Sequence, residues 1–433
     1  MAEKRKKKIR TKEIKWDKLD NTAHLFPVIA GEGMSNVYRI CVVLKEEIKR
    51  ELLQEALDAV LPLFPVFNSR LRQGMFWYYF EENGKKAPKV TEEHTYPCQY
   101  IEPNTNRSYL FRVSYYQNRI NLEVFHVLTD GMGAVNFLRE LTYRYLRLAH
   151  RELAEKMPEG LSEETSLNTE DSFLKNYKRS SSGSNYKTER AWLLTGPSFE
   201  KGKMGLIHGY MPVSALKKQA SAYGASINEY LVAALFWGIY RESLLGKPAK
   251  EPVTSCVPVN LRPFFDSVTT KNFFAVVTAV FYSKKENCSF EEVLESVKTS
   301  LRQQLTREHL EDVISYNVSN EKNLILRAVP LWLKKPAIRY VYEGAAKANT
   351  TTVTNLGNIR VQKEYEGYIE QFYAFLSRSK GQDLKGCVCS YRDTLVFTFS
   401  SVLKDTGVQR GFFRFLASQG IPVRIETNGV YYE

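Results

Sequence analysis

The order in which strand and helix patterns alternate constrains the fold of this chain most. Segments with the two-residue period of a β-strand are interleaved with segments whose apolar residues recur at helical spacing. In the first half we expect strands at residues 36–44 and 109–126, and helices at 46–61 and 133–149. Such a mixture excludes all-helical and all-β folds and predicts an α/β (α+β) architecture.

A polar stretch separates this half from a second half of the same character. The stretch is rich in Ser and charged residues, which is typical of a linker. Ordered patterns resume near residue 206, where Ser226 and Glu229 have the spacing of a capping box ahead of a long apolar helix. We therefore expect four segments: a basic disordered tail (1–14), an N-terminal lobe (15–165), a linker (166–205) and a C-terminal lobe (206–433).

The positive charge of the chain is concentrated at its start. The formal net charge is +13, and residues 1–12 hold seven Lys or Arg and one Glu. A nucleic-acid-binding protein needs a basic stripe on a folded face, so we expect no nucleic-acid partner. We interpret the tail as a solvated arm, with a tether to an anionic membrane as the alternative.

Composition narrows the compartment and the kinds of site. No segment approaches the roughly 18–20 apolar residues of a membrane-spanning helix, so we expect none. The six cysteines are scattered and the histidines are not clustered, which predicts no metal site. These features favour a cytoplasmic protein, with peripheral membrane attachment through the tail as the alternative.

One short motif indicates chemistry. Residues 126–131 read His-Val-Leu-Thr-Asp-Gly, where the expected strand ends and the helix begins. In this composition an H-x-x-x-D-G match is expected about 0.008 times by chance. His126 shares the apolar face of the strand with Leu122 and Val124. Burial keeps an imidazole neutral near pH 7, which suits a general base for an attacking alcohol or amine.

The other two residues of the motif predict its local structure. Asp130 lies beyond the strand end, so we expect it to hold the loop through an ion pair rather than to touch the imidazole. Gly131 allows a tight turn into the helix. A histidine that only fills the core is the alternative, and an Asp-Gly pair in register before a helix makes it the weaker one.

The motif resembles the signature of a known superfamily. The segment FHVLTDGMG is similar to the HHxxxDG signature of the chloramphenicol-acetyltransferase-like superfamily, which includes condensation domains and alcohol acetyltransferases. Three more segments resemble the family in the same order: LDNTAHLFPV, CVPVNLRPFF and TVTNLG. The opening segment is most similar to the alcohol acetyltransferase branch. Phe125 replaces the first His of the signature.

The resemblance implies a fold and a set of roles. It implies two lobes, each a mixed β-sheet with flanking helices, and an active-site tunnel between them. His126 is then the catalytic base, and Asp130 is a structural residue whose expected partner is Arg262. The oxyanion donors are expected on a Thr-rich strand, with Asn272 as a weaker candidate for the same tunnel: Thr352, Thr354 and Asn355.

The resemblance also implies a reaction. We expect an acyltransferase (EC 2.3.1) that moves an acyl group, in the simplest case acetyl, from acyl-CoA to a small alcohol by direct attack on the thioester. Coenzyme A enters as a co-substrate, and no bound cofactor is expected. One alternative is condensation-type amide or ester formation with an acyl-carrier protein as donor and an amine as acceptor. The other is a non-catalytic binding or scaffold protein of the same fold.

Overall fold

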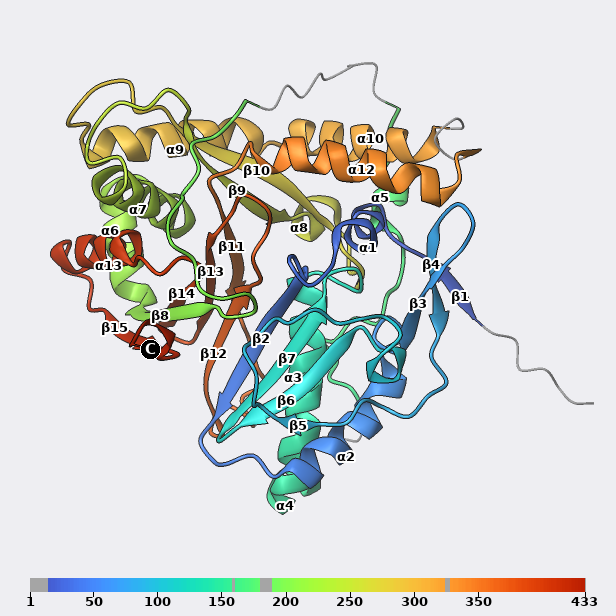
Figure 1. The fold of residues 1–433 in the computed structure, drawn as a ribbon. Helices are drawn as coiled ribbons and strands as arrows, with labels where there is room; N and C mark the ends of the chain where they lie inside the picture. The colour runs from blue at the N-terminus through green and yellow to red at the C-terminus, as the bar shows by residue number, and fades with distance from the viewer. Residues whose placement is uncertain (1–14, 158–159, 180–188, 324–327, 433) are drawn as a thin grey trace, which may run out of the picture.

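The computed structural model describes residues 15–157, 160–179, 189–323 and 328–432. The expected basic tail, residues 1–14, lies outside the described residues. The described part has two large mixed sheets with helices packed on them, arranged as two lobes (Figure 1). The predicted α/β architecture is therefore confirmed.

The N-terminal lobe contains a five-stranded sheet. Its strands lie in the order β12-β2-β7-β6-β5, and all neighbours are antiparallel except the short β5–β6 pair. The elements α2 and α3 pack against each other, and α3 also contacts β2 and β7. The bounds are β2 Val37–Leu44, α2 Arg50–Val60, β5 Thr91–Glu92, β6 Phe111–Tyr116, β7 Arg119–Phe125, α3 Gly131–Ala149, α4 Arg151–Lys156 and β12 Ile369–Leu376.

The C-terminal lobe contains a seven-stranded sheet in the order β10-β9-β11-β13-β14-β8-β15. The strand β11 is parallel to both of its neighbours, and the other pairs are antiparallel. The predicted capping box opens α7. The bounds are β8 Gly205–Pro212, α6 Val213–Ala222, α7 Ile227–Glu242, β9 Val253–Asn260, α8 Arg262–Phe265, β10 Phe274–Phe281, α9 Phe290–Gln304, β11 Thr351–Asn358, β13 Leu384–Tyr391, β14 Thr394–Ser401, α13 Gly407–Ser418 and β15 Arg424–Thr427.

The two lobes exchange an element. The strand β12 belongs to the C-terminal half of the chain, yet it pairs antiparallel with β2 of the N-terminal sheet, with Tyr373 opposite Cys41. In Figure 1 it lies between the two sheets and extends the blue and cyan strands. The expected segment 206–433 thus contributes a strand to the other lobe. Pairing between strands more than 300 residues apart leaves no local pattern in the sequence.

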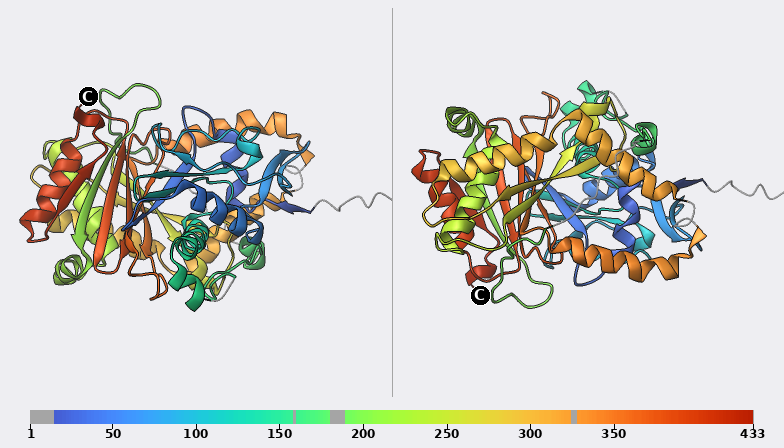
Figure 2. Two further views of the ribbon diagram at one scale, coloured as in Figure 1. Left: turned by 90° about the horizontal axis from the view of Figure 1, so that it is seen from below. Right: turned by 90° about the horizontal axis from the view of Figure 1, so that it is seen from above.

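A small third sheet and two long helices complete the fold. The sheet has the order β1-β4-β3, and α12 lies along one side of the N-terminal lobe while α10 lies along the other (Figure 2). The helix α12 contacts α1, and α10 contacts α5 and β10. The bounds are β1 Trp16–Lys18, α1 Phe26–Ile29, β3 Ser69–Gln73, β4 Tyr78–Glu82, α5 Ser172–Lys175, α10 Arg307–Lys322 and α12 Leu331–Ala346.

The described residues of the expected linker lie against the C-terminal lobe. The amide of Thr270 donates to the carbonyl of Asn168 (2.7 Å), and the amide of Trp192 donates to that of Pro252 (2.8 Å). Ser198 forms an isolated β-bridge with Leu403. Residues 180–188 of the same segment are outside the described residues. The polar composition of this stretch therefore marks a surface connection that is hydrogen-bonded at several points.

Candidate active site

His126 follows the last residue of β7 and lies in an aromatic pocket. Its amide donates to the carbonyl of Asn36 (3.0 Å), which fixes the backbone at the strand end. The imidazole stacks on Phe26, with ring centroids 4.6 Å apart, and meets the edge of Tyr38 at 5.0 Å. Phe274 of β10, from the other lobe, is 5.6 Å away. The side chain is half-buried, so one side of the ring remains accessible.

A buried amide holds one ring nitrogen of His126. The Nδ1 atom lies 3.1 Å from Oδ1 of Asn272, a residue that is 1 % exposed. The Nδ2 group of Asn272 donates to Asp20 Oδ2 (2.9 Å), and so does its backbone amide (3.2 Å). Because an ionised carboxylate only accepts hydrogen bonds, Asp20 orients Asn272 with Oδ1 toward the imidazole. Nδ1 then carries the proton, and Nε2 has a free lone pair.

The electrostatics of this group agree with a neutral base. Burial lowers the pKa of His126, while its own backbone carbonyl, Asp130 and Asn272 act in the opposite direction. Burial raises the pKa of Asp20 to about 7, although the hydrogen bonds from Asn272 and Ala23 oppose this. At neutral pH the imidazole is therefore unprotonated, and Asp20 titrates close to that pH.

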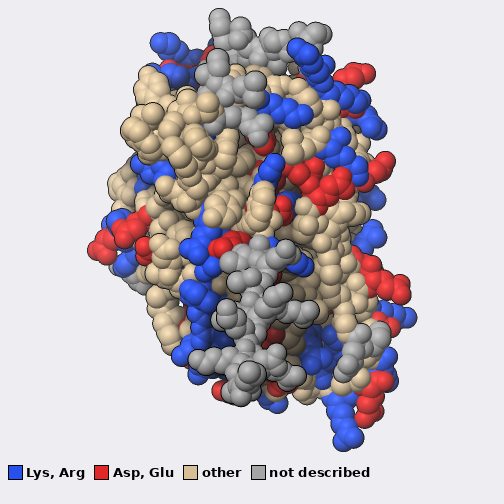
Figure 3. All heavy atoms as spheres, turned by 90° about the vertical axis from the view of Figure 1, so that its right-hand side faces the viewer, with Lys and Arg blue, Asp and Glu red and all other residues tan. Residues whose placement is uncertain are grey.

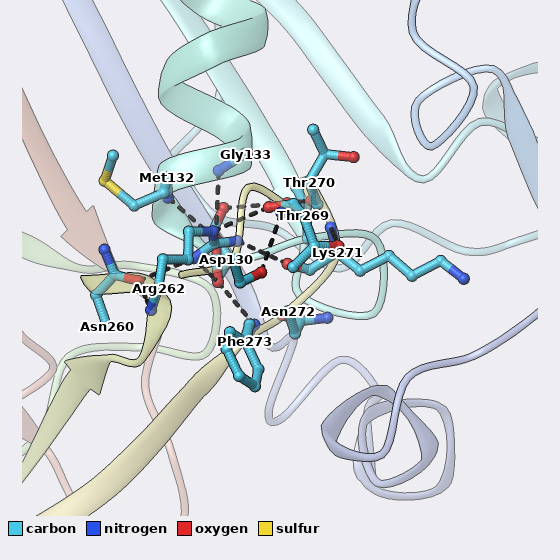
Figure 4. Close-up of polar contacts among 12 residues, drawn as sticks. Asp130, Met132, Gly133, Asn260, Arg262, Thr269, Thr270, Lys271, Asn272 and Phe273 are labelled. Carbon is cyan, nitrogen blue, oxygen red and sulfur yellow. Dashed lines mark hydrogen bonds and ion pairs between the residues drawn. The ribbon is translucent and has the colours of Figure 1, made fainter. Parts of the chain in front are cut away.

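Asp130 and Arg262 form a buried ion pair between the lobes (Figure 4). The guanidinium donates to both carboxylate oxygens, at 2.8 Å and 3.1 Å, which is the bidentate geometry of a strong pair. Asp130 is also the N-cap of α3 and accepts the amides of Met132 and Gly133, both at 3.2 Å. Its side chain points away from the imidazole ring nitrogens, toward the segment that leads into β10.

The same pair positions the segment that carries Asn272. Arg262 donates to the carbonyls of Thr269 (2.9 Å) and Lys271 (2.8 Å), and Asp130 accepts the amide of Phe273 (2.9 Å). The backbone on both sides of Asn272 is thus fixed to the ion pair. The pair contacts neither nitrogen of the His126 ring, but it determines where the hydrogen-bond partner of that ring lies.

Both glycines at the start of α3 are in close contact with neighbours. A Cβ at Gly133 would lie 2.0 Å from Thr129 Oγ1 and 2.6 Å from the carbonyl oxygen of Thr270. A Cβ at Gly131 would lie 2.2 Å from a methyl group of Leu356, which is a side chain that can rotate. Gly133 is therefore needed for close approach of the two lobes, and Gly131 tolerates change more easily.

The three expected oxyanion donors differ in their surroundings. Thr352 is buried and donates to Gln382 Oε1 (2.5 Å), and exposed Asn355 accepts the amide of Gly357 (2.8 Å). Thr354 is half-buried and pairs in register with Cys387, on the sheet face toward the N-terminal lobe. None of the three has a described hydrogen bond with His126. Their role in oxyanion binding stays a prediction.

Sequence reasoning missed two residues near His126. Asp20 orients Asn272, and the only signal for it is its place in the segment LDNTAH. Lys385 is 7 % exposed, and its ammonium donates to Ser379 Oγ (2.5 Å). Burial lowers the pKa of Lys385 to about 8, and its charge lowers the pKa of His126. A lysine inside an otherwise apolar strand pattern is the signal that could have identified it.

Phe125 takes no part in this constellation. It is 1 % exposed and meets the ring of Tyr100, with centroids 6.5 Å apart. Strand alternation places its side chain on the face of β7 opposite to His126. The loss of the first His of the signature therefore leaves the contacts of His126 intact.

Cavities among the described residues lie away from the imidazole. One of about 1090 Å³ lies at the other end of β7, where Arg119, His208 and Tyr373 line it. Another of about 510 Å³ lies beside Arg262 and Leu356. His126 lines neither of them, so the tunnel stays a prediction. No group of His, Cys, Asp and Glu in the described part of the chain could hold a metal ion.

Comparison with known proteins supports the fold. No family model matches the sequence, and no curated protein matches it. The structure resembles F. sporotrichioides TRI101 complexed with coenzyme A and T-2, with a TM-score of 0.64 and 11% identity over 95% of this chain and 99% of that one. It also resembles the first condensation domain of the calcium-dependent antibiotic synthetase, with a TM-score of 0.64 and 15% identity over 93% and 96% of the two chains.

A third similar structure is polyketide synthase associated protein 5 from Mycobacterium tuberculosis. The TM-score is 0.60 at 14% identity, and the match covers 93% of this chain and 96% of that one. All three similarities extend over nearly the whole length of both chains. The protein therefore has the two-lobed fold of the chloramphenicol-acetyltransferase-like and condensation-domain acyltransferases, and no branch within that group is favoured.

The ion pair predicts a stability phenotype. Asp130→Ala leaves the guanidinium of Arg262 buried without its carboxylate, and it removes the N-cap of α3. We expect the free energy of unfolding to fall by about 3–5 kcal/mol, measured by urea denaturation. A double-mutant cycle with Arg262→Ala should show strong coupling between the two side chains. An unchanged melting curve for Asp130→Ala would contradict the structural role.

The two glycines predict a contrast. Gly133→Ala forces a methyl group against the backbone of Thr270, and we expect a loss of about 1–3 kcal/mol in unfolding free energy. Gly131→Ala is the matched control, because only the side chain of Leu356 must move. Thermal melting of the two variants measures the difference. Equal melting temperatures would show that the lobes do not meet at Gly133 as described.

Proposed function

We propose that the protein is an O-acyltransferase that uses His126 as a general base and coenzyme A thioesters as acyl donors. The hydrogen bond from Nδ1 to Asn272 is the observation that carries this proposal, because it leaves Nε2 free to accept a proton. The lowered pKa of the imidazole and its half-buried position support the same role. Cytoplasmic location belongs to the proposal as well.

The chemistry proceeds in two steps. The acceptor hydroxyl gives its proton to Nε2 of His126 as its oxygen attacks the thioester carbonyl carbon, and the carbonyl oxygen becomes an oxyanion. The tetrahedral intermediate then collapses, the C–S bond breaks, and the leaving thiolate takes the proton from Nε2. The base is thereby regenerated, and the protein forms no covalent bond to the acyl group.

The developing oxyanion needs a donor or a nearby positive charge. We assign this role to the β11 and β13 face opposite His126, where Thr354 and Thr352 lie beside Lys385 in register. Lys385 is the charged member of this face, and its ammonium has a neutral oxygen as its described partner. Asn355, held by Gly357, lies at the exposed end of the same strand.

The donor assignment draws on two structural neighbours. TRI101 was observed with coenzyme A, and a starter condensation domain of rhizomide synthetase was observed with C8-CoA. A panel of CoA thioesters crossed with alcohols and amines, read by release of free thiol, tests the proposal. Turnover with an alcohol supports it, and turnover only with carrier-bound thioesters or amines favours the condensation reaction instead. The absence of all transfer favours a binding protein.

The first functional prediction concerns the base. His126→Ala should lower kcat by about 10²–10⁴-fold, and the half-buried position leaves the melting temperature nearly unchanged. In the native protein the rate should fall as the pH decreases through a midpoint below 6.5, since protonation removes the lone pair of Nε2 and the pKa of His126 is lowered. Stopped-time assays over pH 4.5–8.5 measure this. Near-native turnover by His126→Ala would refute the role.

The second prediction concerns Asp20 as a positioning residue. Asp20→Asn lets the amide of Asn272 turn over, so that Nδ1 loses its acceptor. We expect kcat to fall roughly 10- to 100-fold by analogy with supporting residues of other sites, with KM little changed. Asp17→Asn is the matched control, because Asp17 pairs with Lys271 at the surface. Equal kinetics of the two variants would exclude the positioning role.

Stability against pH gives an independent readout for Asp20. Its pKa is raised to about 7 in the folded protein, above the value of an unfolded chain. The folded state therefore binds more protons than the unfolded state between about pH 4 and pH 7, and the unfolding free energy should decrease as the pH rises through this window. Asp20→Asn should remove that part of the slope, as measured by denaturation at several pH values.

A further inference from the structure

The helix α12 has the reverse of the usual arrangement of a surface helix. Its basic residues turn toward the protein: Lys334 donates to the carbonyl of Phe76 (3.2 Å) and Arg339 to that of Val28 (2.8 Å). The ammonium of Lys334 also lies 3.6 Å from the ring centroid of Trp77. In a soluble protein such a helix normally directs its apolar stripe inward and its charges to water.

Large apolar side chains occupy the outer side of α12. Trp332, Leu333, Tyr340 and Val341 are 66%, 50%, 81% and 69% exposed. Met75 is 67% exposed and adjoins them, because its carbonyl accepts the amide that begins the helix (2.9 Å). We call these five residues the α12 face. Single exposed apolar residues are common, but a group of this kind on one element marks a surface that another phase or molecule covers.

The α12 face carries no unpaired negative charge. The helix contains a single carboxylate, Glu343, which forms an ion pair with Lys380 at 2.6 Å. A negatively charged surface can therefore approach the face without repulsion from this helix. Figure 3 shows the side of the molecule on which α12 begins, with a broad uncharged area bordered by Lys and Arg side chains.

The basic start of the chain joins the fold beside this face. Residues 1–12 hold seven Lys or Arg, and the described chain begins just before β1 with Trp16, which is 66% exposed. The strand β1 pairs with β4, and the turn between β3 and β4 contains Met75 of the α12 face. A strongly cationic segment thus emerges from the same small sheet against which α12 lies.

Trp, Tyr and aliphatic side chains next to a cluster of Lys and Arg are the combination that binds anionic bilayers. The aromatic rings prefer the headgroup region, and the basic residues are attracted to acidic lipids. We propose that the α12 face, together with the basic N-terminal segment, docks the protein on an anionic membrane surface. A protein partner accounts for the exposed rings, but it leaves the adjoining cationic segment without a role.

This docking is peripheral. In the part of the chain that the structure describes, no helix is long and apolar enough to cross a bilayer. The apolar side chains enter the headgroup region, and the basic residues neutralise lipid charge at its surface. The inference concerns where the protein acts and does not depend on the proposed reaction, so either can fail without the other.

Sedimentation with lipid vesicles tests the proposal. The full chain should sediment with phosphatidylcholine vesicles that contain 30 mol % phosphatidylserine and remain in solution with phosphatidylcholine alone. Trp332→Ser combined with Tyr340→Ser should lower the partition coefficient at least tenfold. Gln at Lys4, Lys6, Lys7 and Lys8 should have a similar effect and should abolish the dependence of binding on salt concentration.

A matched variant controls for loss of exposed apolar surface in general. Leu245→Ser combined with Tyr432→Ser removes two side chains that are 70% and 84% exposed outside the α12 face, and it should bind as the native chain does. Thermal melting verifies that each variant is folded. Absence of sedimentation, or sedimentation unaffected by the Trp332 and Tyr340 changes, would overturn the proposal. So would a dimer in solution that those changes dissociate, because the face would then bind a second copy.

Discussion

The site depends on a single buried carboxylate, that of Asp130. Removing two charges from water is costly, and an ion pair alone rarely offsets that cost. Here Asp130 accepts five hydrogen bonds: two from Arg262, two from the first turn of α3 and one from Phe273. One side chain thus fixes the direction of the helix after His126, the packing of the two lobes and the backbone that carries Asn272.

The imidazole at the seam is controlled from both lobes. The N-terminal half supplies Phe26 and Tyr38 as pocket walls, and the C-terminal half supplies Asn272 as hydrogen-bond acceptor. Asp20 then fixes the orientation of that amide. The proton position on His126 is therefore a property of the assembled molecule rather than of the local motif.

The sequence was informative wherever the determining contacts are local. The strand that ends at Phe125, the helix after Gly131 and the capping role of Asp130 lie in one continuous segment, and alternation and spacing reveal them. Asp20 and Lys385 act across more than a hundred residues, so their roles depend on strand register and lobe packing. The helix α12 was expected only as part of an irregular helical stretch, because amphipathic analysis assumes that the apolar side faces inward.

The shared strand β12 has a consequence for how the molecule is made. Until the ribosome has synthesised Ile369–Leu376, β2 has no partner on one side, although it lies in the interior of the finished sheet. An unpaired strand edge is a template for intermolecular association. The nascent N-terminal half must therefore wait for most of the polypeptide, or be shielded by a chaperone, and a gene fragment that ends at the linker would yield an adhesive, incomplete sheet.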